Sequence, residues 1–442
     1  MTVIGLDDTD SRERGMCTTY LAATVADELR AAGHAVTRRL LVRLNPAVEH
    51  KTRGNAALAV HTDAPAAVCR ELVASRLDMA ATADPETNPG VVVAPADPAD
   101  VPADVAAFAR GAVRERHAIA DARALLDGHD YAHLQEGNGR GLIGALAAVG
   151  AWRAFDDWTY ECISYRERDR WGTPRDVAHE SVFAAAEAAY PDAWDTVDRV
   201  EGETVCVPHT PCPILHGVRG DDPDAVREVA KRIDGEPIAS RALFVTNQGT
   251  DAHLRNASIS AVVDGRAYRV TGTVVEAPET RRGGHVFLTI GGDDHATDAT
   301  NADATNADAT RDHDGHRLRC AAFEPTKRFR DRVRDLRVGD RITACGEVSE
   351  GTLKLEKFAV RDLVRTERVT PDCPDCGRSM DSAGRDQGYR CRDCGTAAPG
   401  KVAREIPRDI ERGWYEVPPC ARRHVAKPLV RGGFDAPVHP ER

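Results

Sequence analysis

Long hydrophobic runs are missing from this chain of 442 residues. No uninterrupted apolar stretch approaches the roughly 20 residues that a membrane-spanning helix needs, so we expect no such helix. A basic leader followed by a cleavage site is also missing from the amino end, and a cytoplasmic location is therefore the expectation. The length predicts roughly two to four domains, each large enough to bury its own core.

Positive charge is in short supply, and the net charge is −11. This balance argues weakly against nucleic-acid binding. Arginine greatly outnumbers lysine, and alanine and aspartate are abundant, which is typical of proteins adapted to high salt. An acidic surface then serves solubility rather than partner recognition. Residues 34–55 and 327–334 are locally basic; each is either a solvated face or a surface for a polyanion.

The twelve cysteines do not have the pattern of a disulfide framework. Four of them form two Cys-x-x-Cys pairs separated by fourteen residues, and the other eight are scattered. Two such knuckles joined by a hairpin place four thiolates around Zn²⁺, and because sulfur fills every position the site is predicted to be structural. A rubredoxin-type iron site is the alternative. The predicted ligands are Cys373, Cys376, Cys391 and Cys394.

An acidic turn near the amino end is the most informative stretch of the sequence. The apolar run Val3–Leu6 predicts a buried strand, and Asp7, Asp8 and Asp10 follow at its carboxyl end. Clustered carboxylates repel one another unless a cation lies among them, and Mg²⁺ with a nucleotide is the usual cation. We therefore predict that all three aspartates are catalytic and that Asp7 and Asp8 bind Mg²⁺. The alternative is a turn in which aspartate only caps the next helix.

Further residues fit a phosphate site around these carboxylates. Thr18 and Thr19 open the first predicted helix, and either hydroxyl could contact a phosphate or accept a phosphoryl group; we predict that Thr18 is catalytic. A glycine-rich turn enters a later helix, where backbone amides can reach a phosphate, although it lacks the Gly-Lys-Ser/Thr ending of a P-loop. The residues predicted to bind ATP or its phosphates are Thr19, Lys51, Arg53, Gly137, Asn138, Gly139 and Arg140.

Hydrophobic periodicity predicts a multidomain α+β protein. Residues 1–155 alternate short strands and helices and form an α/β domain with its active edge at the end of the first strand. Its predicted strands are 2–6, 36–43 and 56–61, and its predicted helices are 17–32, 64–80, 101–124 and 141–150. Residues 156–256 have the order β-α-β-β-α-β of a ferredoxin-like unit, with middle strands near 203–207 and 213–218. The polar loop 246–251 that ends this unit has no obvious core role.

The carboxyl-terminal half divides into three parts. Residues 257–365 hold five short strands, the first at Ala257–Val263, around a helical segment at 325–335, which indicates an OB-fold; another small barrel is the alternative. Residues 293–316 have almost no hydrophobic side chains and are predicted to be a disordered insertion. A zinc ribbon at 366–400 and a basic extension at 401–442 follow.

Together these parts predict an ATP-using enzyme that holds a polynucleotide with its carboxyl-terminal half. Five segments of the sequence form a distinctive set: Gly5–Ser11, Gly15–Tyr20, Arg43–Pro46, Lys51–Asn55 and Gly137–Gly141. On these segments, and in the same domain order over nearly the whole chain, the sequence resembles the archaeal tRNA(Ile) 2-agmatinylcytidine synthetases, or agmatidine synthases. It departs from that family mainly in the insertion at 293–316.

The resemblance implies a ligase that modifies tRNA. Such enzymes attach agmatine to C2 of the wobble cytidine in the isoleucine tRNA with anticodon CAU, so that it reads AUA; ATP is used, AMP is released, and the cytidine O2 is phosphorylated first. The resemblance also implies a kinase-like first domain in which Thr18 becomes phosphorylated. It implies that the barrel and ribbon hold the acceptor stem while the first two domains receive the anticodon loop. The residues predicted to contact tRNA are Arg328, Arg330, Arg422 and Arg423.

Two other functions compete with this one. An aspartyl-phosphate phosphatase would use Asp8-Thr9-Asp10, but Arg12 occupies a position where that chemistry normally has threonine or valine. A non-catalytic protein that binds RNA or single-stranded DNA would use the barrel and ribbon, and it leaves the aspartate cluster unexplained. Release of AMP from ATP in the presence of tRNA and agmatine separates an enzyme from a binding protein.

Overall fold

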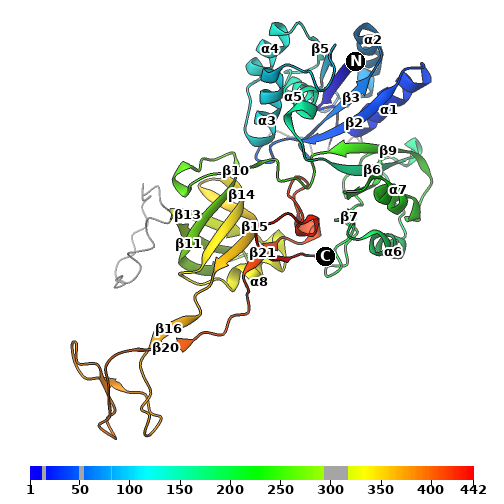
Figure 1. The fold of residues 1–442 in the computed structure, drawn as a ribbon. Coiled ribbons are helices and arrows are strands. Elements are labelled where there is room, and N and C mark those ends of the chain that lie inside the picture. The colour runs from blue at the N-terminus through cyan, green and yellow to red at the C-terminus, as the bar shows by residue number, and fades with distance from the viewer. Residues whose placement is uncertain (12–15, 49–53, 81, 293–316) are drawn as a thin grey trace.

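The computed structural model describes residues 1–11, 16–48, 54–80, 82–292 and 317–442 (Figure 1). These residues form one large sheet flanked by helices, a barrel, a small module that projects from the barrel, and a tail that returns to the body of the protein. Within these ranges no helix combines the length and the apolarity that crossing a membrane would require.

The amino-terminal unit is a five-stranded antiparallel sheet, in the order β5-β4-β1-β3-β2, with helices on both faces. Helices α1 and α2 share one core with the sheet, and α3 and α5 share the other. The predicted strands are confirmed, whereas β4 and β5 were missed and the predicted helix 101–124 is two helices. The elements are β1 (Thr2–Asp7), α1 (Thr18–Ala31), β2 (Val36–Arg43), β3 (Ala56–Thr62), α2 (Ala66–Arg76), β4 (Gly90–Ala94), α3 (Ala103–Arg114), α4 (Ile119–Gly128), β5 (Ala132–Gln135) and α5 (Gly141–Ala154).

Glycines bring α5 unusually close to the sheet. A Cβ on Gly5 of β1 would collide with the backbone of Ala145, and one on Gly90 of β4 would collide with Gly141. Because no side chain separates the two backbones, the start of α5 lies directly beside the end of β1. This contact places the glycine-rich turn next to the aspartate cluster.

The second unit continues the same sheet. Its strands run in the order β9-β6-β8-β7, and β9 pairs in parallel with β2 through Leu40 and Val245, so nine strands form one sheet. The predicted order of elements is confirmed, but the predicted strand at 203–207 is wrong. That segment is a turn that packs beside β8, and β7 pairs with β8 instead. The elements are β6 (Thr159–Arg166), α6 (His179–Ala189), β7 (Ala193–Trp194), β8 (Ile214–Gly220), α7 (Pro223–Arg232) and β9 (Ile238–Thr246).

The third unit is a closed barrel. Strand β11 pairs with β12, β12 with β13, β13 with β15, β15 with β14, and β14 with β11 again. The predicted strand Ala257–Val263 is wrong; this segment contains a short 3₁₀ turn whose Ile259 enters the barrel core. The elements are β10 (Leu254–Asn256), β11 (Ala267–Thr280), β12 (Val286–Gly291), β13 (Arg317–Ala322), α8 (Phe329–Arg334), β14 (Arg341–Ser349) and β15 (Thr352–Asp362). The predicted insertion 293–316 lies outside the described residues.

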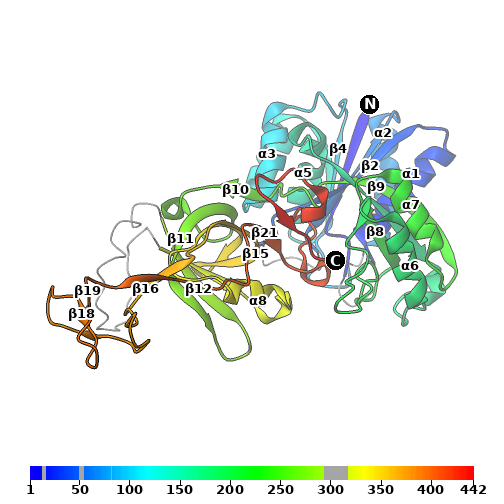
Figure 2. The same ribbon diagram turned by 60° about the horizontal axis from the view of Figure 1, so that its bottom comes forward.

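A cysteine-containing module projects from the barrel on a two-stranded stalk (Figures 1 and 2). The stalk pairs β16 (Thr366–Val369) with β20 (Val402–Glu405). The module itself is a small sheet of β17 (Asp381–Ser382), β18 (Tyr389–Arg390) and β19 (Ala397–Ala398). Its core holds only Cys373, Met380 and Cys391.

The carboxyl-terminal tail lies between the barrel and the second unit, drawn red in Figure 1. Its strand β21 (Gly413–Glu416) pairs with β15, and β22 (Val438–His439) pairs with β21. The tail then reaches the loop after β9, where the Gly249 and Asp251 amides donate to the carbonyls of His424 (2.8 Å) and Val425 (2.9 Å).

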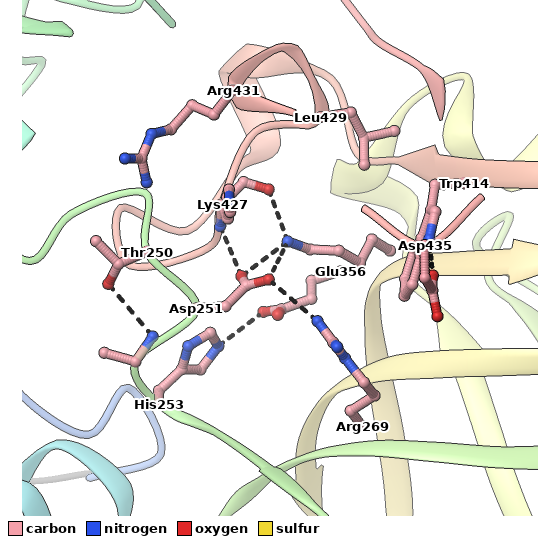
Figure 3. A network of polar contacts seen from close by, with 12 residues as sticks. Thr250, Asp251, His253, Arg269, Glu356, Trp414, Lys427, Leu429, Arg431 and Asp435 are labelled. Atoms are coloured by element: carbon pink, nitrogen blue, oxygen red, sulfur yellow. Dashed lines mark hydrogen bonds and ion pairs between the residues drawn. The ribbon is translucent and has the colours of Figure 1, made fainter. Parts of the chain in front are cut away.

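A buried charge network fixes this junction (Figure 3). The Lys357 ammonium, 1% exposed, donates to both carboxylate oxygens of Asp251 (2.8 and 2.9 Å) and to the Lys427 carbonyl (2.6 Å). Next to it, His253 Nε2 lies 3.2 Å from Glu356 Oε2. The loop 246–251, which had no obvious core role in the sequence, thus joins the second unit, the barrel and the carboxyl-terminal tail.

Candidate active site

Two cavities meet at the carboxyl end of β1. The larger, about 540 Å³, is lined by Asp7, Asp8 and Asp10 and lies within the amino-terminal unit. The smaller, about 290 Å³, lies between the amino-terminal and second units. Both are bordered by Asp10, Gly54 and Ala56, so they are neighbours. All three predicted catalytic aspartates therefore face one cavity, and one of them faces both.

Asp8 is the anchor of the larger cavity. Its Oδ2 accepts hydrogen bonds from Arg140 Nε (3.0 Å), from Arg140 Nη2 (2.8 Å) and from the Asn88 amide (3.2 Å). Its backbone has a φ of 56°, a left-handed conformation that aspartate tolerates better than most residues. Arg140 also donates to the Glu86 carbonyl (2.6 Å). A metal ion that binds at this oxygen must therefore compete with Arg140 and the Asn88 amide.

Asp7 ends β1 and presses against the first turn of α5. A Cβ on Gly144 would collide with the Asp7 carboxylate, so only glycine leaves room for it. Burial, followed by the charges of Asp8 and Asp10, raises the pKa of Asp7 well above its usual value. A cation in the cavity would favour the ionised form of this carboxyl group.

The glycine-rich turn contributes side chains, rather than free backbone amides, to the larger cavity. Gly137 and Gly139 have φ values of 63° and 86°, which glycine adopts without strain. The Asn138 amide donates to Asn88 Oδ1 (2.9 Å), the Arg140 amide to Asn138 Oδ1 (2.8 Å), and the Gly141 amide to the Asn88 carbonyl (3.1 Å). These three amides, which we expected to face a phosphate, have partners within the protein. Instead, the turn points the Asn138 and Arg140 side chains into the larger cavity.

Thr18 and Thr19 open α1 and line the smaller cavity. Thr18 is buried, and its hydroxyl oxygen accepts a hydrogen bond from Thr9 Oγ1 (3.1 Å). Thr19 Oγ1 lies 3.1 Å from Cys17 Sγ. Thr18 and Thr19 thus line a different cavity from Asp8 and Arg140, and Asp10 borders both. Lys51 and Arg53, also predicted to bind phosphate, lie outside the described residues.

Sequence reasoning missed most of the smaller cavity. Arg43 of β2, Glu161 of β6, Arg219 of β8 and His424 of the tail all line it. They come from four segments far apart in the chain, and no motif joins them. In the larger cavity it likewise missed Asn88, which becomes visible only once β4 is placed beside β1.

The four cysteines of the projecting module converge. Their sulfur atoms all lie within 4.8 Å of one another, and Cys376 Sγ is 3.6 Å from Cys391 Sγ. Four Zn–S bonds of about 2.3 Å in a tetrahedron place sulfur atoms about 3.8 Å apart, so the arrangement fits zinc. The two knuckles match in their backbone as well, since the Gly377 and Gly395 amides donate to the Cys373 and Cys391 carbonyls.

Elsewhere in the described residues, one other group of acidic and histidine side chains converges in this way: Asp251, His253 and Glu356. The Lys357 ammonium already occupies Asp251, so this group is an ion-pair network. Asp7, Asp8 and Asp10 line one cavity without converging on a point.

The four arginines predicted to contact tRNA all have protein partners. Arg328 binds Glu441 (2.5 Å) and Asp198 (3.1 Å), Arg330 donates to the Gly284 carbonyl (2.8 Å), and Arg423 binds Glu347 (2.5 Å). Arg422 is buried against Asp195 and Glu416. Its guanidinium joins the tail to the second unit in this structure, and its contact with tRNA stays a prediction.

Comparison with known proteins identifies a family with the same domain order. Family models described as the TiaS TCKD domain, the TiaS FLD domain and the TiaS C-terminal zinc ribbon domain match residues 3–67, 139–253 and 370–410. An isoleucine-tRNA 2-agmatinylcytidine synthetase TiaS from Haloquadratum walsbyi is 54% identical, with all of both chains covered. The enzyme of that name from Methanosarcina mazei is 45% identical over 97% of each chain.

The chain belongs to the isoleucine-tRNA 2-agmatinylcytidine synthetase family, TiaS. Solved structures of this family have the same fold. A complex of TiaS with its isoleucine tRNA and ATP is 37% identical with a TM-score of 0.85, covering 100% of this chain and 99% of the other. A complex of TiaS with its isoleucine tRNA, AMPCPP and agmatine is 35% identical with a TM-score of 0.83 and the same coverage. The resemblance stated from the motifs is therefore confirmed.

Proposed function

We propose that this protein joins agmatine to C2 of the wobble cytidine in isoleucine tRNA with anticodon CAU, using ATP. Family membership at 54% identity over the full length carries this proposal, together with relatives solved with their isoleucine tRNA, ATP and agmatine. A non-catalytic RNA-binding protein is disfavoured, because it would have no use for a buried aspartate cavity. The family assignment also leaves no support for a phosphatase.

The larger cavity is our proposed ATP site. It is lined by Asp7, Asp8, Asp10, Asn138 and Arg140, with Arg140 paired to Asp8, and these are the kinds of side chain that Mg²⁺ and phosphate oxygens require. Mg²⁺ often uses only one or two carboxylates together with phosphate oxygens, so the three aspartates need not converge in the protein alone. The protein's own part would be to hold the triphosphate in line with its acceptor.

The smaller cavity is our proposed acceptor site. It adjoins the larger one at Asp10, and Thr18 lines it, so a phosphoryl group leaving the ATP site arrives beside that hydroxyl. A flipped wobble cytidine would enter here, since a base must leave its stack before chemistry on its ring. Glu161 is a candidate partner for the cationic groups of agmatine.

We further infer the roles of the remaining parts. The domains are assigned as a kinase-like domain at 1–155, a ferredoxin-like domain at 156–256, an OB-fold at 257–365, a zinc ribbon at 366–400 and an extension at 401–442. The strand orders β9-β6-β8-β7 and β11-β12-β13-β15-β14 support the second and third names. Zn²⁺ on the four cysteines would be structural. Cytoplasmic location stays a prediction.

The predicted tRNA arginines differ in their surroundings. Arg423 stays a predicted contact, and it lines a cleft of about 660 Å³ between the amino-terminal unit and the barrel, in which four basic side chains are matched by four carboxylates. Arg328 and Arg330 remain predictions, since the polyanion would have to compete with their present partners. Arg422 also remains a prediction, and a contact with tRNA would require its buried ion pairs with Asp195 and Glu416 to open.

Mass spectrometry of nucleosides tests the function directly. The full-length protein is incubated with ATP, agmatine, Mg²⁺ and unmodified isoleucine tRNA with anticodon CAU. A cytidine heavier by agmatine less one water is expected, and none is expected when the wobble base is uridine. An unmodified cytidine after prolonged incubation, with tRNA shown to bind, would refute the assignment.

A further inference from the structure

Two arginines lie close together on one wall of the smaller cavity. Arg43 of β2 and Arg219 of β8 both line it, and neither forms a close ion pair within the described residues. The carboxylate nearest to Arg219 is Asp195 at 4.0 Å, and Asp195 also binds Arg422. Arg43 donates to the neutral side chain of Gln248 (3.2 Å), and its Nε is buried without a hydrogen-bond partner. Two half-satisfied guanidinium groups on a cavity wall favour an anion.

His424 of the tail completes this wall. Arg219 Nη1 donates to His424 Nδ1 at 2.9 Å. Arginine only donates, so Nδ1 must be the acceptor. The charge of Arg43, burial and the charge of Arg219 together lower the pKa of His424 well below its usual value, and the ring is neutral. Its hydrogen therefore lies on Nε2, where the ring is a donor rather than a base.

Two carboxylates share the cavity and limit what the wall can bind. Glu161 accepts a hydrogen bond from Gln248 Nε2 (2.5 Å), and its charge also acts on Arg43. Asp10 borders the opposite side, toward the ATP site. Thr18 lines the same cavity, so an anion that meets Arg43, Arg219 and His424 shares this space with the Thr18 side chain.

We propose that Arg43, Arg219 and His424 form an anion subsite for a phosphate monoester beside Thr18. This inference rests on the proposed function, in which a phosphoryl group is transferred and then displaced. In the displacement, the agmatine nitrogen bonds to C2, the C2–O2 bond breaks with its electron pair, and the nitrogen's proton leaves with the phosphate. The two guanidinium groups stabilise the charge that develops on that departing phosphate. The tail thus supplies a positioning residue, His424, to the acceptor site.

Binding of inorganic phosphate tests the subsite without requiring turnover. Calorimetric titration uses the full-length, zinc-loaded protein with a non-hydrolysable ATP analogue saturating the larger cavity. Wild type is expected to bind one phosphate, and Arg219→Gln is expected to weaken this binding at least about tenfold. Arg227→Gln, an exposed arginine on α7 of the same unit, is the matched control and should bind as wild type does. No phosphate binding by wild type, or equal binding by Arg219→Gln, would overturn the proposal.

Histidine variants separate positioning from packing. His424→Gln keeps an N–H donor and His424→Leu removes it, so we expect agmatine transfer to fall about 100-fold in the leucine variant and to be partly restored in the glutamine variant. Equal losses in both, accompanied by a lower melting temperature, would mean that the residue only packs the tail.

The phosphate could be carried by Thr18 or by the cytidine O2, and γ-labelled ATP distinguishes these sources. The labelling is done without agmatine. If Arg219→Gln loses the label on tRNA but keeps the label on the protein, the subsite belongs to the cytidine phosphate. If it loses the label on the protein but keeps the label on tRNA, the subsite belongs to phosphothreonine. Normal labelling of both with normal agmatine transfer would contradict the subsite. The wild-type nucleoside assay reports separately on the function, so the two can fail independently.

Discussion

Replacing Asp8 by asparagine isolates the charge of the carboxylate that anchors the larger cavity. Asparagine has the same shape and also tolerates the left-handed backbone at φ 56°, whereas alanine adds about 1 kcal/mol of strain. Asp8 is 7% exposed and accepts two hydrogen bonds from Arg140. Such charged hydrogen bonds contribute about 1.5–3 kcal/mol, so we expect the free energy of unfolding to fall by about 2–3 kcal/mol.

The effect on catalysis should be larger than the effect on stability. On the proposed assignment of Asp8 to Mg²⁺, the substitution removes electrostatic stabilisation of the transferred phosphoryl group, and AMP release should fall at least about 100-fold. Binding of tRNA should change little, because we assign most of that contact to the carboxyl-terminal parts. The assays are AMP release with tRNA and agmatine, urea unfolding, and filter binding of labelled tRNA.

A matched control keeps this experiment sharp. Asp27 on α1 also pairs with an arginine, Arg30, but it is exposed and lines neither cavity. Asp27→Asn should cost less than about 0.5 kcal/mol and leave AMP release unchanged. If Asp8→Asn released AMP at the wild-type rate, the assignment of the larger cavity to ATP would be wrong.

Three further predictions concern the rest of the molecule. Cys376→Ser should unfold only the projecting module, whose buried cluster is three side chains, so a protease should cut between 366 and 405. The variant should bind tRNA more weakly but still cleave ATP, and loss of ATP cleavage in step with loss of zinc would contradict this. Burial lowers the pKa of His61 from 6.5 to about 3, so below pH 6.5 the unfolded state binds a proton that the folded state does not. This histidine should therefore lower the free energy of unfolding by about 1.4 kcal/mol per pH unit below 6.5. His61→Phe should remove this contribution, and an unchanged slope would refute the assignment. Asp251→Asn leaves the Lys357 ammonium buried without its carboxylate and should lower the free energy of unfolding in urea by about 3–5 kcal/mol. The double variant Asp251→Asn/Lys357→Met should recover part of this loss, and fully additive losses from the two single variants would mean that the side chains do not interact.

Local patterns predicted the elements that depend on local forces. The bounds of β2 agree with the predicted 36–43, and β1 and α1 agree within a residue, because an apolar run and an amphipathic period are both contiguous. The segment 203–207 failed for the opposite reason. Its apolar side chains do enter a core, but they do so from a turn, and no sequence signal separates the two cases.

The candidate site likewise contains residues that a local motif predicts and residues that only the tertiary fold brings together. Asp7, Asp8 and Asp10 are neighbours in the chain, so one motif found them. The wall of Arg43, Arg219 and His424 exists only because β2 pairs with β9 and the tail crosses to the second unit. Arg422 illustrates the same limit, since its basic run indicates an exposed surface whereas the fold buries this side chain against Asp195.

The position of His424 has a consequence for synthesis of the protein. A ribosome makes the aspartate end of the catalytic region first, but the opposite wall of the acceptor cavity must wait until nearly the last residues have emerged. A chain that stops early, even one with a folded barrel and ribbon, would lack that wall. Formation of the complete cavity is therefore coupled to completion of the chain at least to residue 424.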